Sequence, residues 1–265
     1  MTLVSGNVLI TGATGGLGQA IARAFAQRGA NLILTGRRAE LLEALAAETG
    51  GRAVRCDLVD RHDLQRLVED VTGSAVDVFV ANAGVPASGE LIALSEDRID
   101  RILEVNLRAP IALARALAPG MIERRRGHMV FISSLSGRAA SPASSLYAAT
   151  KFGLRGFALS TRQDLRRQGV GVSVVLPGFI RGAGMFAEAG VKLPPGVGTK
   201  TPGHVAAAVL AAVERDRAEI DVAPVALRLG ARFASAAPEI AATAQRLLGG
   251  RNLAADLASG HRGKD

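Results

Sequence analysis

The chain has 265 residues, of which 48% are apolar, and a formal net charge of +8. That length suits one large domain or two small ones, and the apolar share is enough for a sizeable core. Aromatic residues make up only 3%, which argues against a stacking platform for single-stranded nucleic acid. The basic residues are spread out, and their only dense cluster, residues 124–126, is interpreted as the solvated end of a helix. We therefore expect no nucleic-acid partner.

Predicted strands and helices alternate along the chain. Apolar runs predict six strands, at residues 8–10, 31–35, 53–56, 76–81, 128–133 and 171–176. Helical patterns lie between them, at residues 17–28, 39–48, 62–71, 95–123 and 145–167. Pro110 predicts a kink in the fourth of these helices, because proline lacks the N–H that a helix interior requires. Such apolar strands alternating with helices predict an α/β fold, a doubly wound parallel sheet with helices on both faces.

A glycine-rich loop, residues 11–18, joins the first strand to the first helix. Its glycines, Gly12, Gly16 and Gly18, follow the spacing Gly-x-x-x-Gly-x-Gly. Glycines in this context let the backbone turn tightly and approach a pyrophosphate, which rests on the helix N-terminus. The loop predicts a Rossmann-like dinucleotide site, and a glycine-rich turn without a ligand is the alternative. Asp57, after the third strand, is either an acceptor for an adenine amino group or a strand-end cap.

The end of the second strand bears on which dinucleotide would bind. Folds that prefer NAD usually place an acid there, on the ribose hydroxyls of the adenosine. Here Gly36 takes that place and Arg37 and Arg38 follow, so no acid repels a 2′-phosphate. The planar guanidinium of Arg37 suits a phosphate, whereas Arg38 begins the next helix and is interpreted as the weaker, solvated candidate. We expect NADP(H) as the preferred cofactor, with NAD(H) as the alternative.

The stretch from Tyr147 to Lys151 carries the predicted proton chemistry. Residues four apart on a helix share a face, so the phenol and the ammonium should point the same way. A fixed positive charge favours the phenolate, which makes Tyr147 a candidate general acid or base near neutral pH. The same spacing also occurs by chance on exposed helices, so its meaning depends on the surrounding motifs.

Cysteine and histidine usage excludes further classes of site. The single cysteine, Cys56, cannot form an internal disulfide and fits a reducing compartment, so we expect a cytoplasmic protein. The four histidines are far apart in sequence, without the spacing of metal ligands, and we expect no metal. A strand pattern begins at once, so no signal peptide is expected. No apolar run approaches the roughly 20 residues that span a bilayer.

Taken together and in this order, the motifs resemble the short-chain dehydrogenase/reductase family, in its single-domain Ser-Tyr-Lys branch. The resemblance covers residues 5–222. It rests on Thr11 and the glycine loop, Asn82-Ala83-Gly84, Asn106, Ser134 thirteen residues before Tyr147, Lys151, and Pro177-Gly178.

This resemblance implies a role for each catalytic candidate. Tyr147 would exchange a proton with the substrate oxygen, and Ser134 would hold that oxygen. Lys151 would bind the nicotinamide ribose and lower the pKa of Tyr147. Asn106 would hold a water that links Lys151 to solvent. Ser133 and Ser136 are rivals for the serine role, but the thirteen-residue spacing favours Ser134.

The resemblance also implies a set of cofactor contacts. They are Gly12, Thr14, Gly16, Leu17, Gly18, Arg37, Arg38, Asp57, Leu58, Asn82, Ala83, Gly84, Tyr147, Lys151, Pro177, Gly178 and Ile180. Asn82 is expected mainly to steady the central strands. One departure concerns Gly182, where the family often has a threonine that contacts the nicotinamide carboxamide. A backbone group would have to replace it, or the nicotinamide end would be held more loosely.

The sequence predicts one main domain, a lid within it, a helical appendage and a C-terminal tail. Residues 1–222 are expected to form the main domain, with residues 182–201 as a lid over the substrate. Phe179, Met185 and Phe186 would give that lid an apolar underside, or else are ordinary loop packing. Residues 223–248 form a helical appendage that covers the cleft, packs at a subunit interface or touches a membrane surface. Residues 249–265 are expected to be disordered.

The predicted function is an NADP(H)-dependent oxidoreductase that interconverts a carbonyl and a secondary alcohol on a small, apolar substrate. The alternatives are an NAD-dependent alcohol dehydrogenase and a non-catalytic NADP-binding regulator. In relatives the long helices around Asn106 and Tyr147 form subunit interfaces, so we expect a homodimer or homotetramer. Small residues suit close helix approach there or packing on the sheet: Ala148, Ala149, Gly153 and Gly156.

Overall fold

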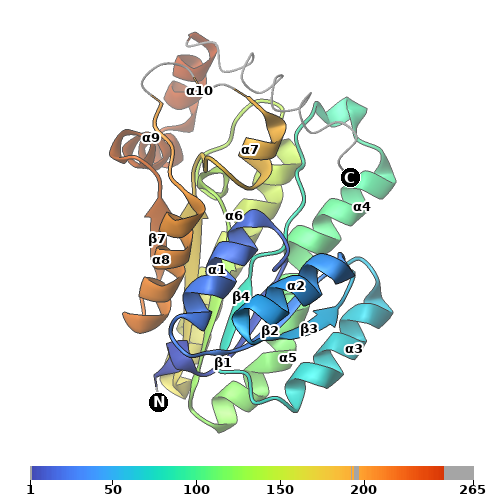
Figure 1. The fold of residues 1–265 in the computed structure, drawn as a ribbon. Helices are drawn as coiled ribbons and strands as arrows, with labels where there is room; N and C mark the ends of the chain where they lie inside the picture. The colour runs from blue at the N-terminus through green and yellow to red at the C-terminus, as the bar shows by residue number, and fades with distance from the viewer. Residues whose placement is uncertain (1, 192, 194–196, 248–265) are drawn as a thin grey trace.

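Seven parallel strands form one sheet in a computed structural model that describes residues 2–191, 193 and 197–247. The strand order is β3-β2-β1-β4-β5-β6-β7, and every pairing within it is parallel. Helices lie on both faces (Figure 1), so the doubly wound α/β fold is confirmed. The expected disordered tail, residues 249–265, lies outside the described residues.

All six predicted strands are present, and a seventh follows that the sequence patterns did not predict. Their bounds are β1 (Asn7–Thr11), β2 (Asn31–Gly36), β3 (Arg52–Arg55), β4 (Val78–Ala81), β5 (Gly127–Ile132), β6 (Val170–Pro177) and β7 (Glu219–Val222). β7 was not predicted because the charged residues Glu219 and Asp221 interrupt its apolar run.

The helices divide into two layers. Around the sheet lie α1 (Gly16–Ala26), α2 (Ala39–Thr49), α3 (Arg61–Thr72), α4 (Glu96–Leu103), α5 (Ala109–Glu123), α6 (Ser145–Leu165) and α8 (Pro202–Glu214), of which α8 was not predicted. One core joins α1, α2 and α8 to the sheet, through side chains such as Phe25, Leu42 and Val209. The other joins α3, α5 and α6 to the opposite face, through Leu67, Leu113 and Leu154 among others.

The interruption predicted near Pro110 takes the form of a π-helical turn. A π-helical turn, Glu104–Arg108, joins α4 to α5. Pro110 lies two residues after this turn, in the first turn of α5, and it cannot donate the backbone hydrogen bond that a continuous helix has at this position. Single π turns inside helices are frequent at functional sites, and this one contains Asn106.

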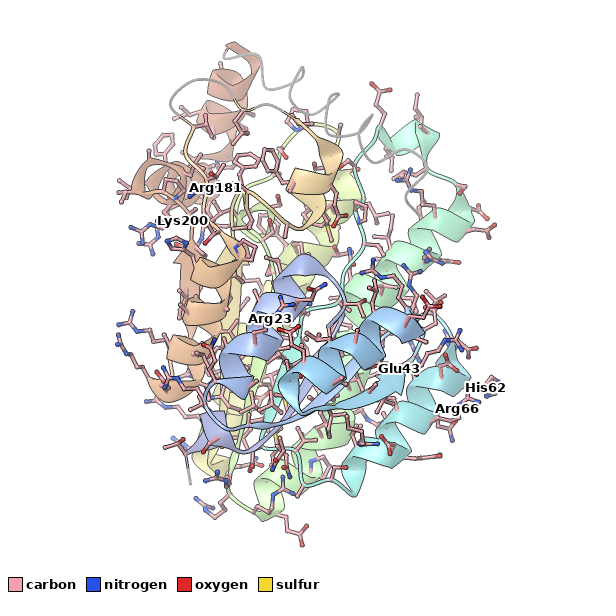
Figure 2. The ribbon with its side chains drawn as sticks, in the orientation of Figure 1. Arg23, Glu43, His62, Arg66, Arg181 and Lys200 are labelled. Carbon is pink, nitrogen blue, oxygen red and sulfur yellow. The ribbon has the colours of Figure 1, made fainter. Side chains whose placement is uncertain are left out.

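The lid and the appendage lie together above the carboxyl ends of the strands (Figure 1). The lid contains α7 (Met185–Ala189), and the appendage folds as α9 (Val225–Ala236) and α10 (Pro238–Leu247). The lid returns to the sheet through a bridge between Ile180 and Lys200. Figure 2 shows Arg181 and Lys200 close together at this base of the lid, where the Arg181 amide donates to the Lys200 carbonyl at 2.9 Å.

Candidate active site

A cavity of about 1000 Å³ opens at the carboxyl ends of the strands. In open α/β sheets ligands bind at this edge, where the strand order reverses, and the reversal here lies between β1 and β4. Every expected cofactor contact lines the cavity, and so do Ser134, Tyr147 and Lys151. Asn106 is the one expected site residue that lies behind its wall.

The glycine loop is fixed by the end of β4. The side-chain amide of Asn82 donates to the carbonyl oxygens of Thr11 at 3.0 Å and Gly12 at 3.1 Å. Gly12 has φ of 63°, and a Cβ there would lie 2.7 Å from the Cα of Ala83, so only glycine is tolerated. Asn82 therefore steadies the central strands, as the sequence predicted, by holding the loop that opens α1.

This loop fits the diphosphate of a dinucleotide. The first turn of α1 carries no acidic side chain, and its N-cap, Gly15, offers no side-chain bond. The first amides of the helix are thus left for an anion, which the helix dipole also favours. Thr35 lines the same cavity, and its buried hydroxyl has no hydrogen-bond partner within the described part of the chain.

The two arginines at the adenosine end differ in their contacts. Arg38, the weaker and solvated candidate, is exposed, but its guanidinium also donates to the carbonyl oxygen of Thr14 at 2.7 Å and to the Thr14 hydroxyl. Arg37 is exposed and has no side-chain bond within the described residues, so its guanidinium is free to take a ligand. A Cβ at Gly36 would lie 3.3 Å from the Thr14 hydroxyl.

The third strand ends at the adenine side of the cavity. The Asp57 carboxylate accepts from the amide of Val59 at 3.2 Å, which fits its interpretation as a cap and leaves its other oxygen without a bond among the described residues. Cys56 beside it is buried, and burial raises the pKa of its thiol to about 12. The thiol is therefore protonated and inert at neutral pH.

The serine candidates are separated by their partners. The Ser133 hydroxyl is buried and donates to the carbonyl oxygen of Lys151 at 2.9 Å, so it is structural. Ser134 is the N-cap of the turn η4 (Leu135–Gly137), and its hydroxyl accepts from the Ser136 amide at 3.1 Å. The Ser134 hydroxyl also interacts with the Tyr147 phenol in a way that lowers the pKa of that phenol.

Tyr147 and Lys151 lie one turn apart on α6, as predicted, but their electrostatics differ from the prediction. Burial raises the pKa of Tyr147 above its ordinary value of 10, and the Ser134 bond opposes this only in part. The Lys151 ammonium donates to the carbonyl oxygen of Ile132 at 3.1 Å. Lys151 is buried, and burial lowers its own pKa from 10.5 to about 8. The expectation that Lys151 lowers the pKa of Tyr147 is therefore not met in this structure, because desolvation of both groups predominates.

The Asn106 side chain holds the segment after β4 by two bonds. Its oxygen accepts from the amide of Val85 at 2.8 Å, and its nitrogen donates to the Val85 carbonyl at 3.0 Å. Both ends of this amide are therefore engaged by the backbone of Val85. A Cβ on the neighbouring Gly84 would lie 3.4 Å from the Asn106 oxygen and 3.6 Å from the Lys151 nitrogen.

The lid packs directly on the glycine loop. A Cβ on Gly16 would meet the Cβ of Ala183 at 2.2 Å, so a side chain at position 16 would push the lid away. Gly182, at the position of the family threonine, has φ of 82°, a backbone conformation that favours glycine. The rings of Phe179 and Phe186 lie 5.0 Å apart, and both line the cavity with Met185.

A wall of the cavity comes from α9, which sequence reasoning did not identify residue by residue. Ala226, Leu227, Gly230, Ala231 and Ala234 line the cavity, while Val225, Leu229 and Phe233 on the other side of the helix are exposed. The apolar, small residues at positions 226, 230 and 234 recur every four residues, and this spacing is the signal that marks one helix face.

Metal sites and membrane spans can be assessed from the side chains and helices of the described residues. No group of three or more metal-ligating side chains occurs among them, and Figure 2 shows His62 on the outer surface of α3, away from the cavity. Within the same residues, no helix is long and apolar enough to span a membrane.

Comparisons with known proteins agree with this geometry. A family model described as short chain dehydrogenase matches residues 6–192. The ketoacyl reductase HetN of Nostoc sp. is 36% identical over 230 residues, which cover 83% of this chain and 79% of that protein. A short-chain dehydrogenase from Sphingobium yanoikuyae, solved with NADPH, has a TM-score of 0.78 at 28% identity and covers 88% of this chain and 94% of its own. A metagenomic short-chain oxidoreductase solved with NADP has a TM-score of 0.72 at 32% identity, over 85% of this chain and 99% of its own.

Proposed function

The chain belongs to the short-chain dehydrogenase/reductase family, and from this premise we propose that it interconverts a carbonyl compound and a secondary alcohol with NADP(H). The observation that carries the proposal is that Ser134, Tyr147 and Lys151 line one cavity together with the glycine loop. A protein that only bound a dinucleotide would have no need of a serine hydroxyl and a tyrosine phenol that line the same cavity and interact with each other.

The chain's own residues would bind, orient and move a proton. The nicotinamide, when bound, supplies the hydride. Ser134 holds the substrate oxygen by a hydrogen bond from its hydroxyl. Tyr147 donates its proton to that oxygen in the direction of reduction and takes it back in the direction of oxidation. The raised pKa of Tyr147 keeps it protonated at neutral pH, which favours its action as the acid of a reductase.

Lys151 and the residues near it would hold the nicotinamide ribose. The Lys151 ammonium lies close to Gly84, because a Cβ on that glycine would be 3.6 Å from the Lys151 nitrogen. Its side chain is buried, so a hydrogen bond that it donates is strengthened by the low local dielectric. Asn106 would act through the backbone of Val85, which it holds in two bonds.

We assign NADP(H) from the adenosine end. Arg37 is exposed at the rim of the cavity and has no side-chain bond within the described residues. A guanidinium in this condition can pair with the 2′-phosphate at no cost of breaking another bond. Arg38 holds Thr14, on the glycine loop, and supports the phosphate site from behind. The Sphingobium and metagenomic relatives, solved with NADPH and NADP, support the same choice.

The substrate end of the cavity favours an apolar carbonyl compound. Phe179, Met185 and Phe186 from the lid region line the cavity together with Leu227 and Ala231 of α9. Aromatic and aliphatic walls with few polar groups are typical of pockets for apolar ligands. The ketoacyl reductase name of the Nostoc relative adds β-keto acyl compounds to the candidates.

A panel of carbonyl compounds tests the proposal. The purified chain would be mixed with NADPH, or in parallel with NADH, and with aliphatic ketones, aryl ketones and β-keto esters, and loss of reduced-cofactor absorbance would be followed. We expect turnover of at least one class with NADPH and slower turnover with NADH. Tight NADPH binding without turnover of any carbonyl compound or alcohol would instead favour the non-catalytic regulator.

We also propose a homodimer or homotetramer, assembled through α5 and α6. Ala149 and Phe152 on α6 are exposed, and a Cβ at Gly156 would meet nothing within 4 Å, so part of this helix is open to a partner helix. Gly153 packs on Leu107 instead. Light scattering at micromolar concentration would test the assembly, and a monomer at that concentration would contradict it.

A further inference from the structure

Two carboxylates lie on the edge strand β7, on the side of the sheet that α6 covers. Successive side chains of a strand point to opposite faces. Ile220 packs on the core shared with α1 and α8, so Glu219 and Asp221 point to the opposite face. The Asp221 side chain is 3% exposed and that of Glu219 is 20% exposed. Buried carboxylates at an edge strand require partners.

Three arginines from three separate segments provide those partners. Arg138, directly after η4, pairs with Glu219 and, at 3.1 Å, with Asp221. Arg155 of α6 pairs with Glu219. Arg232 of α9 pairs with Asp221 at 3.2 Å.

Each of these segments also carries part of the site. Arg138 follows Ser134 by four residues and is separated from it only by the turn η4. Arg155 follows Lys151 by four residues and Tyr147 by eight, so the three share a face of α6. Arg232 lies on the helix that forms a wall of the cavity. The two carboxylates thus tie the serine segment, the tyrosine helix and the cavity wall to one strand.

The arginines of this network favour the charged form of Glu219. Burial raises the pKa of Glu219, but the hydrogen bonds from Arg155 and Arg138 outweigh burial and hold that pKa below its usual value. The Arg138 side chain is 9% exposed, so protein atoms surround its guanidinium and few solvent contacts remain. A guanidinium shared by two carboxylates has a defined geometry, which an isolated surface pair lacks.

We propose that Glu219 and Asp221 are positioning residues that fix the Ser134 segment, the Tyr147 helix and α9 relative to one another, so that the two catalytic hydroxyls meet at one substrate oxygen. The kinetic part of this inference rests on the proposed function. The effect of Ser134 on the ionisation of Tyr147 can be measured without any substrate, because Tyr147 is the single tyrosine of a chain without tryptophan. Its ultraviolet absorbance therefore reports the ionisation of one catalytic group.

A pair on the same helix serves as the matched control. Arg162 of α6 pairs with Asp216 at 2.6 Å, at the end of the helix away from the cavity. Glu219→Gln and Asp216→Asn each remove one carboxylate charge that an α6 arginine holds. A merely structural role for both pairs predicts similar effects of the two variants.

The experiment compares these variants in turnover and in Tyr147 ionisation. With the ketone that the wild type reduces best, we expect Glu219→Gln to lower kcat by about 10- to 100-fold, since small misplacements of catalytic groups cost this much, with NADPH affinity kept. We expect its Tyr147 pKa to rise above the wild-type value, because the Ser134 bond that lowers it is weakened. Asp216→Asn should leave both quantities near wild type. A folded Glu219→Gln protein with wild-type kcat and wild-type Tyr147 pKa would overturn the proposal.

Two further variants keep the test decisive. If Glu219→Gln does not fold, Arg155→Lys keeps the charge but not the planar guanidinium, and the same shift in Tyr147 ionisation is expected. Arg138→Lys should retain more turnover than Arg138→Met, and equal turnover of these two would contradict a positioning role. If the wild type reduces no carbonyl compound, the proposed function fails, while the Tyr147 titration of Glu219→Gln against Asp216→Asn still decides the positioning role.

Discussion

The ammonium nitrogen of Lys151 lies 5.6 Å from the centre of the Tyr147 ring and donates its hydrogen bond to the carbonyl of Ile132. The cation thus faces the ring and is fixed by the backbone of β5. Both groups are desolvated, and each has a pKa shifted toward its neutral form. The ionisation of Tyr147 and that of Lys151 can each be measured.

Replacing Tyr147 by phenylalanine removes the hydroxyl and keeps the ring. We expect turnover to fall by at least about 10²-fold, the typical contribution of a positioned general acid. The packing under the ring is unchanged, so NADPH affinity and thermal stability should stay near wild type. Steady-state kinetics and fluorescence titration with NADPH check both points, and a variant that keeps most of its turnover would remove Tyr147 from the mechanism.

The ionisation of Tyr147 can be followed directly. Because the chain holds one tyrosine and no tryptophan, an absorbance titration of the phenolate reports this side chain alone. We expect a pKa above 10, since burial raises it. Ser134→Ala should raise it further, because the opposing hydrogen bond is lost. A wild-type pKa below 10 in the absence of NADPH would contradict the reading that burial predominates.

The buried Lys151 predicts a pH dependence of stability. Its pKa is lowered from 10.5 to about 8 in the folded chain, so the unfolded chain binds this proton more tightly. Between these two values the free energy of unfolding should rise with pH, by about 3 kcal/mol for this group. The contribution is fully present above 10.5 and is lost as the pH falls through about 8.

Urea unfolding across that pH window measures this contribution. A Tyr147→Phe background removes the titration of the phenol, which overlaps the upper part of the window. Adding Lys151→Met should flatten the remaining slope. An unchanged slope in the lysine variant would mean that Lys151 keeps an ordinary pKa in the folded chain.

The two arginines after β2 should respond differently to removal. Arg37→Ala should weaken NADPH binding by about 10- to 150-fold, from the loss of a charge-assisted bond of about 1.5–3 kcal/mol, and leave NADH binding almost unchanged. Arg38→Ala should weaken both cofactors alike, because its bonds to Thr14 hold the glycine loop. Binding titrations of both variants with both cofactors check this, and equal losses of NADPH and NADH in Arg37→Ala would refute the assignment of NADP.

The wall formed by α9 should limit the size of the substrate. A Cβ at Gly230 would meet nothing within 4 Å, and this residue lines the cavity. Gly230→Leu should therefore fill the cavity and raise KM for bulky aryl ketones more than for small aliphatic ones. Leu229→Ala, on the exposed side of the same helix, is the control for general effects on α9. A uniform change for all ketones in Gly230→Leu would show that α9 does not set the size of the substrate.

Much of the fold and the site could be predicted because its signals are local. The glycine loop, the step from Tyr147 to Lys151, and the alternation of apolar strands with helices are written in short spacings along the chain. Each depends on residues that touch through one turn or one strand, so a linear pattern is enough. The same holds for Gly36, whose missing side chain is itself the evidence for a 2′-phosphate.

What only the tertiary structure decided depends on contacts between distant residues. The bond of Arg38 to Thr14 joins residues 24 apart, and the pairing of Arg138 with Glu219 spans 81 residues. The direction of the Tyr147 pKa shift depends on how much water the surrounding elements exclude, and the place of α9 against the cavity depends on where β7 ends. Linear spacing determines which groups are present and how neighbours are oriented, whereas desolvation and long-range pairing are set only when the whole chain packs.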